Sequence, residues 1–137
     1  MIRSPARIRF VRPRMEALQG GHWRSNGARE ERAGTRNVAA WGLYQRGERA
    51  RKEAEGLLQE DDAAGAFARF AVSDSLFAES ERADPRWAAP GIGRGRLAYR
   101  RARLAVEPRE MLAAINTGLA HAERAVALAP PDAEALE

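Results

Sequence analysis

The sequence predicts an all-α protein in which two antiparallel helical hairpins stack as a short, right-handed α-solenoid. The first observation is that apolar residues return at steps of three and four after residue 37, which is the period of an amphipathic helix. The second is a long-range repeat, in which Pro85 recurs as Pro130 and Arg46-Gly47 recurs, after a slightly longer interval, as Arg94-Gly95. Periods of this size are typical of solenoids, in which each hairpin covers the apolar face of its neighbour.

The composition agrees with closely packed helices. Apolar residues make up 45% of the 137 residues but aromatic residues only 7%, and much of the apolar set is alanine. Burial must therefore come from helices that approach one another closely rather than from layers of bulky side chains. The length is sufficient for one small domain with a modest core.

The first hairpin is expected over residues 37–84. Its first helix carries an apolar stripe formed by Ala40, Leu43, Tyr44, Gly47, Ala50, Ala54, Leu57 and Leu58. A polar break follows, in which Asp61 or Asp62 can cap the next helix by accepting hydrogen bonds from its first backbone N–H groups. The second helix is expected to end at Asp84-Pro85, because proline disfavours helical geometry in the residue before it.

The second helix holds the strongest core candidates. Its apolar stripe consists of Ala63, Ala66, Phe67, Phe70, Ala71, Phe77 and Ala78, and the three phenylalanines are expected to be buried. Ser73 and Ser75 in the same helix are interpreted as small residues that let helices approach closely, in preference to phosphorylation sites.

The second hairpin repeats this pattern at lower strength. A third helix begins within residues 87–92 and continues through Leu97 and Ala98 until Glu107-Pro108 stops it. The fourth helix has an apolar stripe formed by Met111, Leu112, Ile115, Leu119, Ala122 and Val126. Four of these residues, Met111, Leu112, Ile115 and Ala122, repeat Ala66, Phe67, Phe70 and Phe77 at the interval between Pro85 and Pro130. It closes at residues 129–131, and residues 132–137 are read as the first turn of a partial fifth helix.

Positive charge gathers at the start of the chain, in an arginine-rich arm predicted to be irregular over residues 1–36. Residues 1–37 hold nine arginines against three glutamates, a net charge of +6, whereas the other hundred residues sum to −2. Four interpretations stay open: binding to nucleic-acid phosphates, contact with anionic lipid, insertion into a partner subunit, and an unstructured leader. The candidate anion-binding residues are Arg3, Arg7, Arg9, Arg12 and Arg14.

Other features bear on the compartment. The sequence has no cysteine, no apolar stretch long enough to cross a bilayer, and no apolar core of a secretory signal near its start, so a soluble, cytoplasmic protein is expected. Lys52 is the only lysine among 23 basic residues, a bias that indicates a GC-rich, bacterial genome.

The segment 37–137 resembles the tetratricopeptide repeats. The resemblance lies in Asp84-Pro85 after the second helix, in the aromatic Phe77 shortly before it, and in small residues where helices cross. Leu43-Tyr44-x-Arg46-Gly47, followed by Ala-Asp-Pro-x-Trp and Arg94-Gly95, is similar to repeat regions of bacterial signalling proteins, including those attached to serine/threonine kinases. The repeat interval of this chain is longer than that of the family, which is about 34 residues, so HEAT-like and other helical-hairpin arrays stay open.

The resemblance implies binding without catalysis, because such arrays present a groove lined by the first helix of each pair to a peptide or protein segment. In this chain those helices are rich in arginine, which would suit an acidic partner. The candidate partner-binding residues are Arg46, Arg49, Arg94, Arg96, Arg100, Arg101 and Arg103. The alternative is that these side chains form the solvated face of amphipathic helices, with their stems over alanines.

The last hairpin is expected to leave apolar surface open. Met111, Leu112, Ile115 and Leu119 lie in the last complete hairpin, and about three repeats are usually needed before stacking gives a stable core. Met111, Leu112 and Ile115 are therefore further partner-binding candidates, and the protein is expected to be a subunit of an assembly or a homo-oligomer.

No catalytic, cofactor or metal site is predicted. His22 and His121 are isolated histidines without a matching set of ligands, and adjacent acids such as Asp61-Asp62 do not form a facing carboxylate pair. Residues 91–95 read Gly-Ile-Gly-Arg-Gly, but they lack the remaining glycine, the preceding strand and the Gly-Lys-Ser/Thr of phosphate-binding loops.

The functional prediction is thus a non-catalytic interaction module or accessory subunit that binds another protein. Two alternatives stay open: a nucleic-acid-associated protein that binds through the arginine arm, and a regulatory repeat fragment of a bacterial signalling enzyme.

Overall fold

The computed structural model describes residues 34–128, and the chain divides into two compact units, residues 1–36 and residues 37–137. The described part of the second unit contains four α-helices, α3 (Val38–Gln59), α4 (Ala63–Ala83), α5 (Ala89–Leu104) and α6 (Pro108–Ala127). Residues 34–128 contain no strand, which confirms the all-α fold class for this part. The candidate arginines of the arm and the expected turn at residues 132–137 lie outside the described residues.

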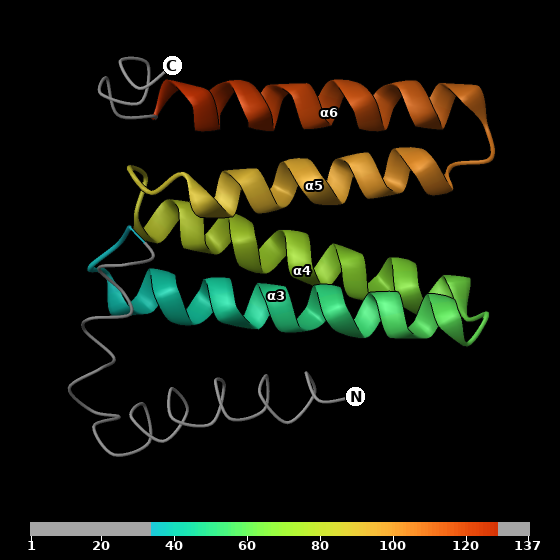
Figure 1. The fold of residues 1–137 in the computed structure, drawn as a ribbon, viewed down its shortest axis with the longest axis horizontal. Helices are drawn as coiled ribbons and strands as arrows, with labels where there is room; N and C mark the ends of the chain where they lie inside the picture. Colours follow the sequence, from blue (N-terminus) through green and yellow to red (C-terminus); the bar gives the residue numbers. More distant parts are fainter. Residues whose placement is uncertain (1–33, 129–137) are drawn as a thin grey trace, which may run out of the picture. The chain divides into compact units, whose positions relative to one another are not determined.

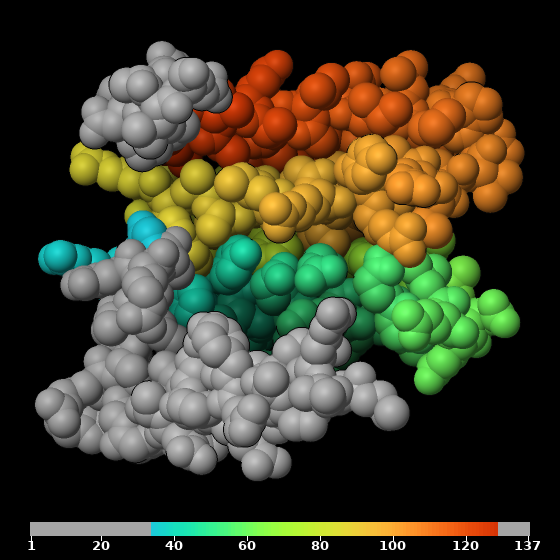
Figure 2. Space-filling view, viewed as in Figure 1, coloured from blue at the N-terminus to red at the C-terminus, as the bar shows by residue number. Residues whose placement is uncertain are grey.

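Each helix lies beside the helix that precedes it in the chain. Figure 1 shows α4 returning along α3, which together form the first pair, and α6 returning along α5, which form the second pair. Helix α5 also packs against α4, so that α5 lies between α6 and the first pair. On the face drawn in Figure 2, the surface of α5 separates that of α6 from that of α3. No helix in the described part is long and apolar enough to cross a membrane.

Side chains of Asn37 and Asp62 define where the first two helices begin. The Asn37 side chain accepts a hydrogen bond from the Ala40 backbone N–H at 2.9 Å, and Asp62 accepts one from Gly65 at the same distance. Each bond satisfies an N–H group that has no partner within its own helix. Of the two expected capping aspartates, the structure therefore uses Asp62, whereas Asp61 adopts the left-handed turn conformation with φ 61°.

Prolines mark the limits of the other helices. Helix α4 ends at Ala83, directly before Asp84-Pro85, as predicted. The prediction for Pro108 was wrong: α5 already ends at Leu104, and Pro108 is the first residue of α6. Proline is well suited to this place, because its missing N–H group would have no helical partner there and its φ angle is already helical.

Phe77 of α4 lies at the centre of the core. Its ring is fully buried, and its two edges face the backbones of α3 and α5, because a Cβ atom at Gly47 would lie only 2.7 Å from Cε1 and one at Gly93 only 2.9 Å from Cε2. Two glycines thus let three helices meet around one aromatic ring. The buried cluster around it also contains Phe70 and Leu97.

Two serines allow α3 and α4 to approach closely. Ser73 and Ser80 are fully buried, and their hydroxyl groups donate hydrogen bonds to the backbone oxygens of Gly47 at 2.7 Å and of Ala40 at 2.8 Å. These bonds satisfy hydroxyl groups that would otherwise be costly to bury. The interpretation as a packing residue is confirmed for Ser73 and was wrong for Ser75, which is exposed.

Phe67 is not a core residue, contrary to the prediction. Its side chain is 42% exposed, whereas Phe70 and Phe77 are buried. The buried face of α4 includes Ser73 and Ser80. This face therefore lies on a different side of the helix from the one that the apolar residues alone would indicate. A reading of hydrophobicity does not detect this face, because the two serines that belong to it are polar.

An aromatic cluster closes one end of the first pair. The ring of Tyr44 lies 5.3 Å from Phe77 and 5.0 Å from Trp87, centre to centre, and Trp87 lies 6.2 Å from Trp41. Such tilted contacts are favourable beyond the area that they bury. Burial raises the pKa of the Tyr44 hydroxyl, and the nearby Glu48 carboxylate acts in the same direction.

Candidate interaction groove

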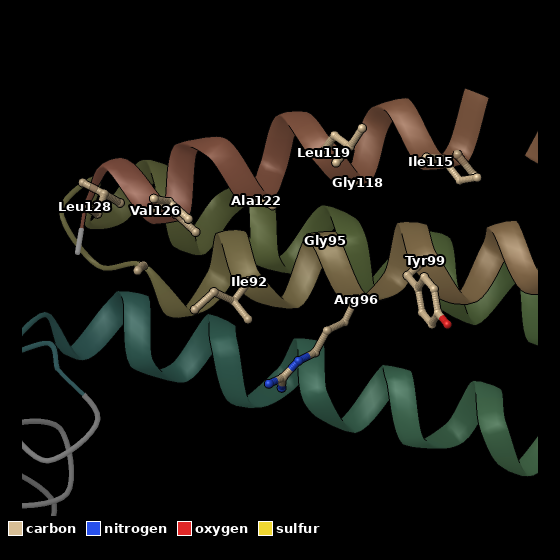
Figure 3. A pocket seen from close by; sticks show the side chains of 13 residues that line it. Ile92, Gly95, Arg96, Tyr99, Ile115, Gly118, Leu119, Ala122, Val126 and Leu128 are labelled. Atoms are coloured by element: carbon tan, nitrogen blue, oxygen red, sulfur yellow. The ribbon is translucent and has the colours of Figure 1, made fainter. Parts of the chain in front are cut away.

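An apolar groove with a volume of about 730 Å³ lies between α5 and α6. Helix α5 supplies one wall and α6 the other, and glycines and alanines form much of its floor, as Figure 3 shows. We call this feature the α5–α6 groove. It is lined by Ala88, Ile92, Gly95, Arg96, Tyr99, Ala114, Ile115, Gly118, Leu119, Ala122, Ala125, Val126 and Leu128.

The large side chains of the groove are open to solvent. Leu119 is 56% exposed, Val126 72% and Tyr99 62%, and Ile92 and Ile115 are also exposed. Isolated exposed apolar residues are common on protein surfaces, whereas here several of them line one continuous groove.

Helix α6 is amphipathic, but its apolar stripe is not the face that it buries. Only His121 and Ala125 are buried, and both lie on the side toward α5. The stripe that contains Ile115, Leu119 and Val126 instead borders the groove. An amphipathic helix gains most of its stability when its apolar face is covered, and within residues 34–128 no helix covers this stripe of α6.

Positive charge borders the groove on the α5 side. Arg96 lines the groove and is exposed, and the Arg103 guanidinium lies 6.0 Å from the centre of the Tyr99 ring, a cation–π distance. No acidic side chain lines the groove. The groove is therefore apolar at its centre, with Arg103 beside Tyr99 on its α5 side, whereas Figure 3 shows the Arg96 side chain extending from α5 toward α3.

Arg94, a predicted partner-binding residue, instead links helices within the protein. Its guanidinium donates to Asp74 at 3.0 Å and to Glu81 at 2.9 Å, both on α4, and Glu81 also accepts from Arg124 of α6 at 3.1 Å. These charges are partly buried, so they are less screened than exposed pairs. Arg94 thus joins α5 to α4 and does not line the groove.

His121 lies next to this network, between α5 and α6. Desolvation lowers its pKa, and the positive charges of Arg94 and Arg124 act in the same direction. The Arg124 guanidinium donates to Nδ1 of His121 at 2.6 Å. Because arginine can only donate, this contact requires an imidazole without a proton on Nδ1.

Arg100 is likewise engaged within the fold. It forms a two-pronged ion pair with Glu55 of α3, at 2.6 and 3.0 Å, which joins α5 to α3 across 45 residues of sequence. The hydrogen bond from Arg100 lowers the pKa of the Glu55 carboxyl group.

The remaining predicted residues fall into separate places. Arg46 and Arg49 are exposed on α3 and do not line the groove, and Arg101 lines a smaller hollow of about 410 Å³ with Phe67. Met111 and Leu112 are 42% and 60% exposed near the start of α6, whereas Ile115 lines the groove. The seven arginines predicted to form one cationic surface are therefore divided, and the groove border includes Arg96 and Arg103.

Sequence reasoning missed the groove itself. Its small residues, including Gly95, Gly118 and Ala122, have no chemical signature, and Tyr99 was not part of any predicted stripe. The available signal was the spacing of apolar residues on α6, which continues through Leu119 to Val126 beyond the candidates that were named. No group of His, Asp or Glu side chains within residues 34–128 is arranged to hold a metal ion.

Comparison with known proteins identifies no relative. No protein-family model matches the chain, and neither a curated protein nor a solved structure matches it.

Proposed function

We propose that this protein is a non-catalytic interaction module, acting as an accessory or scaffold subunit that binds another protein through the α5–α6 groove. The observation that carries the proposal is an apolar groove of about 730 Å³ on the surface, which is lined by Arg96 and has Arg103 beside its Tyr99. Burial of such a surface drives association, while the charged border favours partners of opposite sign.

The proposal includes a repeat architecture, in which the two helix pairs are successive hairpins of a short tetratricopeptide-like solenoid. Gly47 of α3 faces Ser73 of α4. In the second pair Gly95 of α5 faces Gly118 of α6, because a Cβ atom added at Gly118 would lie 3.5 Å from the Gly95 oxygen.

These crossing residues follow the repeat of the sequence. Position 95 follows position 47 at the interval that separates Arg46 from Arg94, which we call the first-helix interval. Position 118 follows position 73 at the interval that separates Pro85 from Pro130, which we call the second-helix interval. Both intervals of the sequence repeat therefore support equivalent crossings in the two pairs.

A direct test compares partner capture by the full chain and by two variants of α6. Leu119→Glu places a carboxylate in the groove, whereas Ala120→Glu places the same charge on the neighbouring exposed residue, which does not line the groove. Both positions are open to solvent, so we expect both variants to fold, which circular dichroism checks. Proteins bound by the unchanged chain should be lost with Leu119→Glu and retained with Ala120→Glu. Equal capture by both variants would contradict a function of this groove.

A second candidate function rests on the arginine arm, whose charge favours nucleic-acid phosphates. Deletion of residues 1–36 separates the two candidates. Nucleic-acid binding through the arm would weaken steeply with added salt and disappear in the deletion variant, whereas partner capture through the groove should persist.

A further inference from the structure

In the first pair, helix α5 covers a surface formed by α3 and α4. We call this surface the seat, and its residues are Tyr44, Phe70, Asp74, Phe77 and Glu81. Helix α5 lies on the first pair with Gly93 against the Phe77 ring and Leu97 buried beside it. Trp87, just before α5, contacts Tyr44 of α3. The apolar centre of this seat therefore accepts a narrow helix surface, because the large Phe77 ring already fills the space.

Charge fixes α5 in that seat from both sides. Arg100 pairs with Glu55 of α3, and Arg94 pairs with Asp74 and Glu81 of α4. Here the receiving pair is acidic and the incoming helix is basic.

The α5–α6 groove is the equivalent seat on the second pair. Counting the first-helix interval onward from Tyr44 of α3 leads to Ile92. Counting the second-helix interval onward from the α4 residues Phe70, Asp74, Phe77 and Glu81 leads to Ile115, Leu119, Ala122 and Val126. All five of these residues line the groove. The groove therefore occupies on the second pair the place where α5 lies on the first.

The size of the central residue differs between the two seats. Phe77 of the first seat corresponds to Ala122 of the second, which leaves a hollow where the first seat has a ring. A helix that fills this hollow needs a bulky apolar side chain where α5 has Gly93, because empty apolar space forfeits packing contacts.

The charge of the seat is also reversed. Glu48 and Glu55 of α3 correspond to Arg96 and Arg103 of α5, since both pairs of positions are separated by the first-helix interval. A helix placed on the second pair would therefore bring its equivalent of Arg100 toward Arg103, where a basic residue would be repelled and a carboxylate attracted. The acids that hold Arg94 in the first seat correspond to Leu119 and Val126, so the equivalent of Arg94 should be apolar.

From these differences we infer that the α5–α6 groove binds an acidic amphipathic helix of a partner protein, lying in the same direction as α5. Its motif is two adjacent bulky apolar residues, an apolar residue four positions after the first, and Asp or Glu seven positions after the first. These spacings are those of Gly93, Arg94, Leu97 and Arg100 in α5, which places them on one helix face. The inference rests on the proposed function and specifies the partner's chemistry.

Charge argues against the arginine arm of this chain as the occupant. The arm carries a net charge of +6 within residues 1–37, and the groove border is also positive. An acidic helix from another protein fits that border, whereas a second copy of this chain is distinguished by the oligomeric state measured below.

The test uses two fluorescent peptides as long as α5, which has 16 residues. Both have leucine where α5 has Gly93, Arg94 and Leu97, in an alanine–glutamine background, and they differ only at the place of Arg100. One carries glutamate there and the other lysine. Fluorescence anisotropy with the full chain should give about fivefold or greater preference for the glutamate peptide at low salt, diminishing as salt is added.

Protein variants identify the contacts. Arg103→Glu should reverse the preference in favour of the lysine peptide, whereas Arg49→Glu, at an exposed arginine outside the groove, should leave it unchanged. Ala122→Phe should fill the hollow and reduce binding of both peptides at least about tenfold, because it recreates the ring of the first seat. Ala120→Phe is the matched control on the exposed side of α6 and should bind as the unchanged chain does.

The outcomes separate this inference from the proposed function. Equal binding of both peptides, still blocked by Ala122→Phe, would overturn the acidic specificity and leave the groove as an interaction site. Absence of binding by either peptide would overturn the inference, and partner capture insensitive to Leu119→Glu would overturn the function as well. A dimer in sedimentation analysis that Ala122→Phe dissociates would identify a second copy as the occupant and overturn the acidic partner.

Discussion

The two helix pairs of this protein cross at similar small residues, but the apolar surface of the first pair is covered and that of the second is open. In the first pair, Gly47 and Ser73 bring α3 and α4 together, and α5 covers the resulting apolar seat around Phe77. In the second pair, Gly95 and Gly118 bring α5 and α6 together, but their apolar seat is the open α5–α6 groove. Apolar spacing alone therefore does not distinguish a buried core from an open apolar surface, because the difference lies in whether a further helix covers it.

The largest expected difference between the pairs is at their central apolar residues. Phe77→Ala removes the ring that joins three helices and should lower the free energy of unfolding by about 3–5 kcal/mol. Leu119→Ala, in the open groove, should change it by less than about 0.5 kcal/mol. Urea unfolding measures both, and similar losses would show that the groove is part of the core.

The two equivalent glycines provide a sharper comparison. Alanine at Gly47 would bring its Cβ 2.7 Å from the Phe77 ring, which cannot shift because Gly93 contacts its other edge, so Gly47→Ala should destabilise by about 1–2 kcal/mol. At Gly95 the nearest atom would be 3.7 Å away, an ordinary contact. Gly95→Ala should therefore be neutral or stabilise by up to about 1 kcal/mol through helix propensity. Thermal unfolding of both variants tests this, and equal tolerance would contradict the packing around Phe77.

A smaller difference is expected between two arginines of α5. Arg100→Gln breaks the pair with Glu55 and should cost about 0.2–1 kcal/mol, a low value because both side chains are about one-third exposed and solvent screens them. Arg103→Gln should have no measurable effect on stability, since its described contact is with the neighbouring Tyr99 ring. Chemical unfolding at low and high salt distinguishes them, and a salt-dependent loss in the Arg103 variant would count against its assignment to the groove border.

The last expected effect is a pH dependence from His121 of the second pair. Its pKa is lowered in the folded protein by burial and by neighbouring arginines, so the unfolded chain binds a proton more readily. The stability contributed by this group is complete above the ordinary histidine pKa of about 6.5 and is lost as the pH falls below it.

The urea midpoint should accordingly fall between about pH 7 and pH 5.5, and His121→Gln should flatten that part of the profile. An unchanged slope in the variant would mean that other groups cause the dependence. Arg94 and Arg124 provide the positive surroundings, so the effect belongs to the junction of α4, α5 and α6 and not to the first pair.

The sequence by itself determined the helices, because their signals are local. The apolar period, the Asp62 cap and the stop before Pro85 each act within a few residues, so four helices could be predicted with small errors at their ends. The repeat intervals were visible in the same way. Pro108 was misread because proline ends one helix and begins another with equal ease.

Which side chains are covered depends on how the helices pack. Phe67 and Phe77 are equally apolar, yet one is exposed and one buried, because Ser73 and Ser80 face α3 through hydrogen bonds that hydrophobicity does not register. Arg100 and Arg103 are equally basic, yet Arg100 meets Glu55 from 45 residues away. Burial and ion pairing depend on neighbours that are distant in the chain, and a local pattern cannot specify which neighbour arrives.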